Sequence, residues 1–382
     1  MMENVEIRKV ADQKALRTFV NFYYDLYRDC PFAVPFLYSD EMATLSPSKN
    51  PAYDHCEVQL FLAYKDNKVV GRVAAFINKK ANERWNRKQV RFGWLDFVDD
   101  LEVSTALIKT VEEWGKARGM NEIAGPLGFT DMDREGMLVE GFDRLATMYI
   151  NYNYSYYAEH INKIGGFVKD NDYVEFYIKI PETVPEKFAK LSKMIESRYN
   201  LRVRKFTRRE LVKEGKGYEI FDILNQTYDG LYGFAKLDSK QIDKLVNEYI
   251  KIADLNLVVG VEDANINKLV GFGISFPSFS KALKKTHDGH LLPFGWWHLL
   301  KILKFHRTDT IDLLLIGVLE EYRSKGANAL IFNELTRQAN EYGFKWAEAM
   351  PQMETNKGVL SHWQYFETEQ HRRHRCFCKQ LN

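Results

Sequence analysis

One stretch of the chain, from Leu313 to Gly343, constrains the fold more than any other. It begins with an apolar run typical of a buried strand, Leu313 to Val318. It continues through the turn Arg323-Ser324-Lys325-Gly326 into a segment with helical periodicity. The unpaired amides and positive dipole of a helix N-terminus attract anions, and a glycine lets a phosphate approach the backbone. The stretch therefore predicts either an anion-binding loop or an ordinary strand–turn–helix connection with a capping glycine.

The residues from Val318 to Leu330 resemble the pyrophosphate-binding motif of the GNAT acyl-CoA N-acyltransferases, an Arg/Gln-x-x-Gly-x-Gly/Ala loop between a strand and a helix. Arg323 and Gly326 match it, whereas Asn328 stands where the family has glycine or alanine, so its side chain either crowds the diphosphate or hydrogen-bonds with it. The resemblance implies acetyl-CoA or another acyl-CoA as co-substrate. It also implies that Asn356 contacts the pantetheine arm. The residues expected to hold the co-substrate are Ile316, Gly317, Val318, Arg323, Ser324, Lys325, Gly326, Ala327, Asn328 and Asn356.

The elements around this loop follow the order of a GNAT domain from about residue 200 to the end. Two apolar runs in residues 257–276 flank a polar turn, which is typical of a hairpin. After the loop come a short strand-like segment at residues 346–351, a helix-like segment at residues 354–366 and a final alternating stretch to Leu381.

The first half repeats this plan. Residues 61–76 form a second hairpin pattern, residues 92–97 a strand, and residues 106–119 a helix. The loop between that strand and helix, residues 98–104, is acidic and lacks the glycine, so it would repel a diphosphate. The first half also resembles a little-characterised bacterial group of GNAT-like proteins, in residues 125–131, 136–143, 152–157 and 165–167.

These patterns predict an α+β chain with two GNAT-like domains, each a mixed, mostly antiparallel sheet flanked by helices. The expected division is residues 1–180, a degenerate copy, and residues 181–382, the copy with the acyl-CoA site. Pro181 and Pro185 mark the boundary, because they interrupt a strand-like run before a helix expected at Glu186 to Tyr199. The halves are expected to pack together with a separate sheet each.

The resemblance implies an acyl-CoA-dependent N-acyltransferase, with acetyl transfer to a small-molecule amine as the expected reaction. Such a reaction needs a base for the amine and an acid for the leaving thiolate. By position, Tyr365 is the candidate acid, and Glu348 and Glu354 are candidate bases. The alternative is a pseudoenzyme that binds acyl-CoA without turnover. A transferase that uses aminoacyl-tRNA is a third, weaker hypothesis.

The composition of the chain limits the kinds of partner and site that we expect. The chain has 54 Lys and Arg against 52 Asp and Glu, a net charge of +2, which argues against a nucleic-acid partner. Four scattered cysteines do not form a disulfide framework, and no His/Cys spacing predicts a metal site. Neither a signal region nor a run long enough to span a bilayer is present in the sequence, so we expect a cytoplasmic protein without stable membrane insertion. The sequence leaves the oligomeric state open.

Residues 279–310 do not fit a minimal domain of this type. This insertion is rich in aromatic residues, with Lys and His spaced along a helical segment from Gly295 to His306. A basic amphipathic helix of this kind either lies on a membrane surface or covers the core of its own domain, and we expect the second. Because it directly precedes the expected cofactor strand, the insertion is also a candidate wall of the acceptor pocket.

Overall fold

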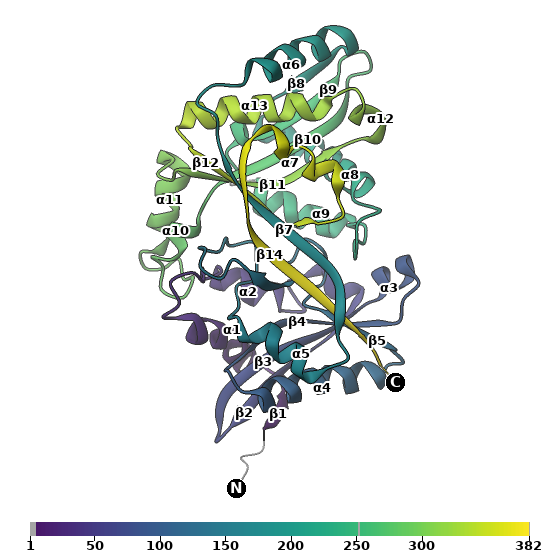
Figure 1. The fold of residues 1–382 in the computed structure, drawn as a ribbon, viewed down its shortest axis with the longest axis vertical. Coiled ribbons are helices and arrows are strands. Elements are labelled where there is room, and N and C mark those ends of the chain that lie inside the picture. The colour runs from purple at the N-terminus through teal and green to yellow at the C-terminus, as the bar shows by residue number, and fades with distance from the viewer. Residues whose placement is uncertain (1–4, 251–252, 382) are drawn as a thin grey trace.

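The computed structural model describes residues 5–250 and 253–381. Figure 1 shows an elongated molecule in which two halves, each a sheet with helices, meet at a pair of long central strands. The elements of the first half are β1 (Glu6–Lys9), α1 (Gln13–Tyr27), α2 (Tyr38–Thr44), β2 (Cys56–Lys65), β3 (Lys68–Asn78), α3 (Lys79–Trp85), β4 (Gln89–Phe97), α4 (Leu101–Lys116), β5 (Glu122–Gly125), β6 (Met137–Glu140), α5 (Tyr156–Ile164) and β7 (Val168–Lys179).

The second half repeats much of this order with additional helices. Its elements are α6 (Glu186–Tyr199), β8 (Leu201–Arg204), α7 (Arg208–Lys213), α8 (Lys216–Thr227), α9 (Ser239–Leu245), β9 (Val258–Asp263), β10 (Lys268–Pro277), α10 (Ser280–Leu283), α11 (Gly295–Phe305), β11 (Thr310–Val318), α12 (Glu320–Arg323), α13 (Ala327–Tyr342), β12 (Trp346–Ala349), β13 (Gln352–Met353), α14 (Lys357–Leu360) and β14 (Glu367–Gln380).

Most predicted elements are present. Both hairpins form, and the first turns through Asp66 and Asn67, which both have positive φ as a two-residue hairpin turn requires. The helix from Glu186 to Tyr199 has the predicted bounds. The segment at residues 354–366 differs, because it contains only α14 and a short 3₁₀ turn. There Trp363 Nε1 donates to Gln352 Oε1 at 2.7 Å and holds the chain against β13.

The strands form one sheet, in which neighbours follow the order β1-β2-β3-β4-β5-β14-β7-β12-β11-β10-β9-β8. The two remaining strands, β6 and β13, pair with β14 and β7 outside this order. This order is palindromic: each strand of the first half has a counterpart at the same distance from the centre. β4 and β5 are parallel, as are β11 and β12, while the hairpins are antiparallel. The α+β class with a mixed, mostly antiparallel sheet is therefore confirmed, and the repeat is visible in the topology.

The expectation of a separate sheet in each half is wrong, because the two halves exchange strands. The C-terminal strand β14 pairs with β5 of the first half, and β7 of the first half pairs with β12 of the second. β7 and β14 also pair with each other along most of their length, as Figure 1 shows at the centre of the molecule. Residues 1–180 and 181–382 remain a proposed division of the sequence, but neither segment contains all the strands of its own half.

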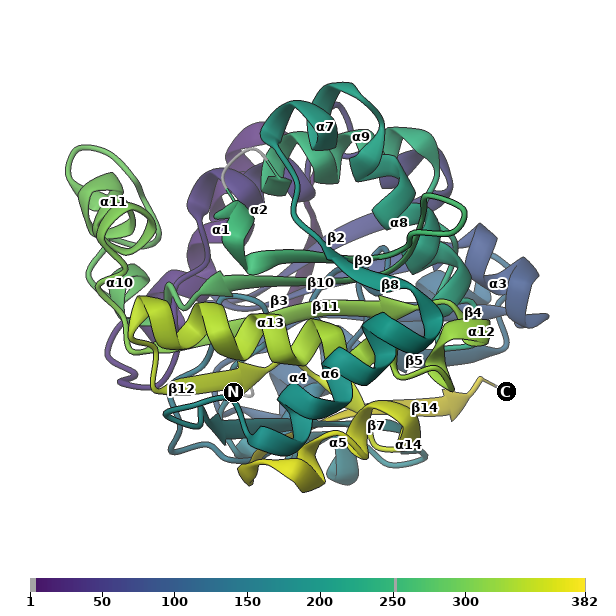
Figure 2. The ribbon, with the colours of Figure 1, turned by 90° about the horizontal axis from the view of Figure 1, so that it is seen from above.

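Helices cover both faces of the second-half sheet. In Figure 2, α13 and α6 lie on one face, and α7, α8 and α9 lie on the other. The largest cluster of buried apolar side chains runs through both halves, from Phe19 and Phe76 to Phe272 and Leu330. The halves therefore share a core as well as a sheet. Among residues 5–250 and 253–381, no helix combines the length and apolarity needed to cross a bilayer.

Candidate functional site

The main cavity lies where two parallel strands of the second half diverge. β11 and β12 pair only from Thr310–Leu313 to Trp346–Ala349, and β13 then turns away to pair with β7. The edge of β11 from Leu314 to Val318 consequently has no strand partner on that side within the described chain. A cavity of about 550 Å³ opens beside this edge. An open strand edge offers backbone amides and carbonyls to an extended ligand.

Both halves of the chain line the cavity. The second half contributes β10, β11, the N-terminal part of α13, the segment from Met350 to Trp363, helix α8 with the loop after it, and Leu245 and Ile250. The first half contributes the loop at residues 131–135, Tyr149, and Tyr173 of β7. The lining includes Asp131, Met132, Asp133, Glu135, Tyr149, Tyr173, Phe221, Tyr228, Leu231, Tyr232, Leu245, Ile250, Phe276, Leu313, Leu314, Leu315, Ile316, Gly317, Val318, Arg323, Asn328, Phe332, Met350, Met353, Asn356, His362 and Trp363. Most of this surface is apolar or aromatic.

The glycine loop is built as the sequence predicts. Gly326 has φ +83° and begins the sixteen-residue helix α13, so the helix N-terminus opens at this turn. Arg323 Nε donates to the Val318 carbonyl at 3.0 Å, which fastens the loop to the end of β11. Tyr322 donates to Asp263 at 2.9 Å and ties the loop to β9. A positively charged, anchored loop at the end of an open strand fits a diphosphate group with an extended arm.

The structure distributes the ten expected co-substrate residues between the cavity and the loop. Ile316, Gly317, Val318, Arg323, Asn328 and Asn356 line the cavity. Ser324, Lys325, Gly326 and Ala327 form the turn into α13 beside it. The Asn328 amide lies 3.3 Å from His362 Nε2, and burial lowers the pKa of that histidine. Asn328 therefore contacts the C-terminal segment across the cavity.

The corresponding place in the first half is filled. Asp100 caps helix α4 with its own carboxylate, which accepts from Glu102 N at 2.9 Å and pairs with Lys65. Where β4 and β5 diverge, the cavity measures only about 20 Å³. The Arg134 guanidinium occupies this region, 3.5 Å above the Phe36 ring and 2.6 Å from a Glu41 oxygen. These contacts agree with the interpretation of the first half as a degenerate copy.

Two carboxyl groups of the first half face the cavity of the second. Oδ1 of Asp131 and Oε1 of Glu135 are shielded from bulk solvent and have no hydrogen-bond partner among the described residues. Burial raises the pKa of Asp131 well above its ordinary value, and repulsion from Glu135 adds to the shift. Burial also raises the pKa of Glu135 to about 7, although a hydrogen bond from Tyr173 of 2.5 Å opposes it. A carboxyl group that titrates near neutral pH can accept a proton there.

A tyrosine hydroxyl lies at the open edge of β11. Tyr228 donates to the Ile316 carbonyl at 3.2 Å, and burial raises the pKa of Tyr228 to about 12. The hydroxyl therefore stays protonated at neutral pH. Tyr228 follows α8, the helix that packs closely on β11, since a Cβ on Gly317 would meet Thr227 Oγ1 at 2.9 Å.

The three residues expected to be catalytic lie away from the cavity lining. Glu348 is buried at the centre of the sheet, where Arg372 donates to it. Glu354 pairs with Lys169 and with Arg373 at 2.8 Å, and Lys169 lowers the pKa of Glu354, which makes it a weaker base. Tyr365 is half exposed and packs edge-on against Phe188 of α6. The structure does not bring these three side chains together with the co-substrate residues at the cavity.

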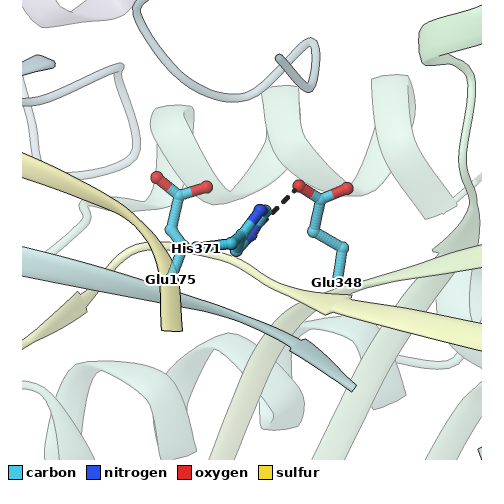
Figure 3. A group of neighbouring side chains, drawn as sticks. All are labelled: Glu175, Glu348 and His371. Atoms are coloured by element: carbon cyan, nitrogen blue, oxygen red, sulfur yellow. Dashed lines mark ion pairs between the residues drawn. The ribbon is translucent and has the colours of Figure 1, made fainter. Parts of the chain in front are cut away.

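Figure 3 shows Glu175, Glu348 and His371, a buried group whose ligand atoms all lie within 4.8 Å of one another. His371 Nε2 lies 3.5 Å from Glu348, and both carboxylates also contact Arg372, which is 3.1 Å from Glu175. Burial opposes ionisation of Glu175, but Arg372 and His374 outweigh it and lower the pKa of Glu175 to about 2. Arg372 already supplies the positive charge that a cation would bring, so we assign this group to the joint between the halves.

Sequence reasoning missed Asp131, Glu135 and Tyr228. The glycine loop lies in the second half, and so do Glu348 and Glu354, the bases expected from the sequence. Strand exchange instead places a first-half loop beside the second-half cavity. The alternation of acidic residues at Asp131, Asp133 and Glu135, between two glycines, was the available signal for a polar site. The insertion was also expected to form a pocket wall, but the cavity lining contains no residue of α10, α11 or the loop between them.

The palindromic sheet, the diverging parallel strands and the glycine loop together define the class: the protein has the tandem GNAT fold. A solved tandem GNAT protein from the clavulanic acid biosynthesis pathway matches it with a TM-score of 0.57 at 11% identity, over 99% of each chain. No protein-family model matches the sequence.

Two curated proteins are similar in sequence. Protein YghO of Escherichia coli (strain K12) is 27% identical over 384 residues, which cover 98% of this chain and 95% of YghO. The bacterial ceramide synthase of Caulobacter vibrioides is 26% identical over 300 residues, which cover 75% of this chain and 73% of that protein.

Proposed function

We propose that the protein is an N-acyltransferase that moves the acyl group of an acyl-CoA onto the amine of a long-chain amino alcohol. The observation that carries the proposal is the cavity between β11 and β12. A basic helix N-terminus lies at one side of it. At another side lie two carboxyl groups with raised pKa values, Asp131 and Glu135, each with one oxygen that has no hydrogen-bond partner among the described residues. This arrangement has what amide formation from a thioester needs: an anion site, an open strand edge and a base.

The lining supports a long apolar chain rather than an acetyl group alone. Phe221, Leu245, Ile250 and Phe276 are among the many apolar side chains of the lining, which an acetyl group alone would not need. The similarity to a protein named bacterial ceramide synthase points the same way, since a ceramide is the amide of a fatty acid with a long-chain amino alcohol. We therefore extend the expected acetyl transfer to transfer of a longer acyl group.

Bound acyl-CoA would supply an activated carbonyl carbon and a thiolate leaving group. In our proposal the carboxylate form of Glu135, which predominates above its raised pKa of about 7, takes a proton from the substrate ammonium. The neutral nitrogen then forms the new C–N bond as the C–S bond breaks, and the second proton that this nitrogen loses returns to the Tyr228 oxygen after its hydroxyl proton has passed to the sulfur. Tyr228 is the proposed acid that protonates the sulfur, because its hydroxyl lies at the open edge of β11. Arg323 and the turn before α13 are proposed to hold the diphosphate.

The test is product formation by the full chain. Acyl-CoA donors with short, medium and long chains are combined with a long-chain 2-amino alcohol and with its short-chain analogue. Thiol release and the mass of the amide are then measured. We expect an amide only with the long-chain amine, at a rate that rises with the length of the acyl donor. Equal rates with acetyl-CoA and short amines would contradict the proposed substrate class.

The second candidate is a binding protein without turnover. Asn328 favours it, because this side chain occupies the loop position where the resemblance expects glycine or alanine, and it contacts His362 across the cavity. If the protein binds coenzyme A in calorimetric titration but releases thiol at the background rate with every amine, this second function replaces the first.

A further inference from the structure

The insertion between β10 and β11 exposes a cluster of large apolar side chains, which we call the insertion patch: Leu292, Phe294, Trp296, Trp297 and Phe305. Leu292 and Phe294 are 78% and 76% exposed, more than any other large apolar residue of the described chain. Figures 1 and 2 show α11 projecting from the side of the molecule, beyond the end of the sheet. The sequence predicts a helix that covers the core of its own domain, and only one face of α11 does so.

The inward face of α11 and the ends of the insertion are fixed to the rest of the protein. Ile302 is buried, with Leu299 and Leu303 packed against the main core. Before the helix, the His290 ring stacks on Tyr38 at 4.2 Å. After it, His306 Nε2 lies 3.0 Å from Asp254. The insertion patch therefore lies outward on an anchored helix and on the loop directly before it.

Basic residues surround the insertion patch. The insertion, residues 279–310, contains six Lys and Arg residues against two acidic residues, Asp288 and Asp309, in a chain whose net charge is only +2. The Lys301 ammonium lies 5.1 Å above the Trp297 ring, and Lys304 lies 6.0 Å from the Phe305 ring. Lysines of this kind can keep their charged ends in water while aromatic rings enter an apolar phase.

We propose that the insertion patch docks the protein on an anionic lipid surface. Exposed tryptophan and phenylalanine side chains on a short helix and the loop before it, accompanied by lysines, suit the boundary between lipid head groups and acyl chains. The excess positive charge suits anionic head groups. A second copy of this chain is a poorer occupant, because a symmetric dimer would bring two such basic segments together.

The docked insertion is continuous with the cavity walls. β10 leads into it and β11 leads out of it, and both strands line the cavity. Docking would therefore hold the cavity close to the lipid surface. The inference goes beyond the proposed function and does not depend on it, since the surface contact needs neither acyl-CoA nor an amine.

The experiment is flotation of the full chain with phosphatidylcholine vesicles, with and without phosphatidylglycerol, in the absence of substrates. We expect binding to the vesicles that contain phosphatidylglycerol. The double variant Trp296→Ser/Trp297→Ser should reduce the bound fraction about tenfold or more. The pair Lys301→Gln/Lys304→Gln should weaken binding to anionic vesicles by about fivefold per lysine at low salt.

Matched controls are Met194→Ser and Ile266→Ser, which change exposed apolar residues outside the insertion and should leave flotation unchanged. Thermal melting of each variant shows whether it folds. Absence of wild-type flotation would overturn the proposal, as would equal flotation of the folded Trp296→Ser/Trp297→Ser variant. A wild-type dimer in sedimentation that this variant abolishes, without vesicle binding, would instead assign the insertion patch to a second copy.

Discussion

At the scale of single residues, the account rests on Glu135. Its carboxyl group lies in a mostly apolar cavity, and burial raises its pKa to about 7. A base of this pKa is matched to the proton that an ammonium group must lose near neutral pH. Glu348 and Glu354, the bases expected from the sequence, are instead paired with Arg372, Lys169 and Arg373.

We predict that Glu135→Gln lowers kcat by about 10²- to 10⁴-fold, because the amide cannot accept the proton. The wild-type rate should rise with pH through a midpoint near 7, since the carboxylate form is the active one, and the variant should lose this inflection. Glu159→Gln, an exposed substitution on α5, is the control. A pH–rate profile that is the same in the wild type and Glu135→Gln would exclude Glu135 as the base.

Glu135→Gln should lower kcat but raise the stability of the folded chain. The pKa of Glu135 is raised in the folded state from an ordinary value of 4.5 to about 7, so burying the charged form costs stability. Wild-type stability should therefore fall as pH rises from about 4.5 to about 7, whereas glutamine carries no charge to bury. We expect Glu135→Gln to raise Tm by about 1–3 °C at pH 8 and by less at pH 5. A lower Tm for the variant at pH 8 would show that the carboxylate is satisfied in the fold.

At the scale of elements, the two copies use equivalent helices differently. Helix α13 begins at a basic turn with an open N-terminus, while Asp100 closes the N-terminus of α4. Coenzyme A should therefore bind only at α13. Gly326→Asp is a poor test of this, because its Cβ would meet Ile195 at 2.8 Å and its φ is +83°. Any loss of affinity would then mix charge with misfolding.

A cleaner prediction concerns the charges of the loop. Arg323→Gln/Lys325→Gln should weaken coenzyme A binding by about tenfold or more, since each residue loses a contact with the diphosphate. Lys109→Gln, which changes an exposed lysine on α4, should leave the affinity as it is. Calorimetric titration measures both. If the loop variant binds as tightly as the wild type, the diphosphate lies elsewhere.

The sequence predicts the position of single helices and hairpins better than it predicts which distant strands pair with each other. Hairpins, the glycine loop and helix α6 follow from local periodicity, turn residues and prolines, so their positions can be read along the chain. The pairing of β14 with β5 joins residues about 250 positions apart, and no local pattern specifies it. The position of Asp131 and Glu135 at the cavity depends on that exchange and could not be predicted. The sequence shows that the segment of α11 is rich in aromatic residues, but it does not show that these side chains are exposed.

At the scale of the whole molecule, the exchanged strands join the halves into one unit. Buried ion pairs link β7, β12 and β14 through Arg372, which contacts Glu175 and Glu348. A main core that includes side chains of both halves adds to this connection. Separation of the halves would expose two long strand edges and leave buried charges without partners.

We therefore predict a single cooperative thermal transition for the full chain, with equal calorimetric and van't Hoff enthalpies. Residues 1–180 expressed alone should not fold stably, because their sheet ends at β5 without β14. Scanning calorimetry and circular dichroism test the two statements. Two separate transitions, or a stable isolated first half, would show that the halves are independent.

The central claim is that the two halves jointly form one acyl-transfer site, with the co-substrate in the second half and the base from the first. A crystal structure with an unreactive thioether analogue of a long-chain acyl-CoA tests it most directly. The account predicts the diphosphate at the turn before α13, the arm along the open edge of β11, and the sulfur in the cavity that Glu135 lines. An analogue bound at α4, or bound with its sulfur outside this cavity, would contradict the account.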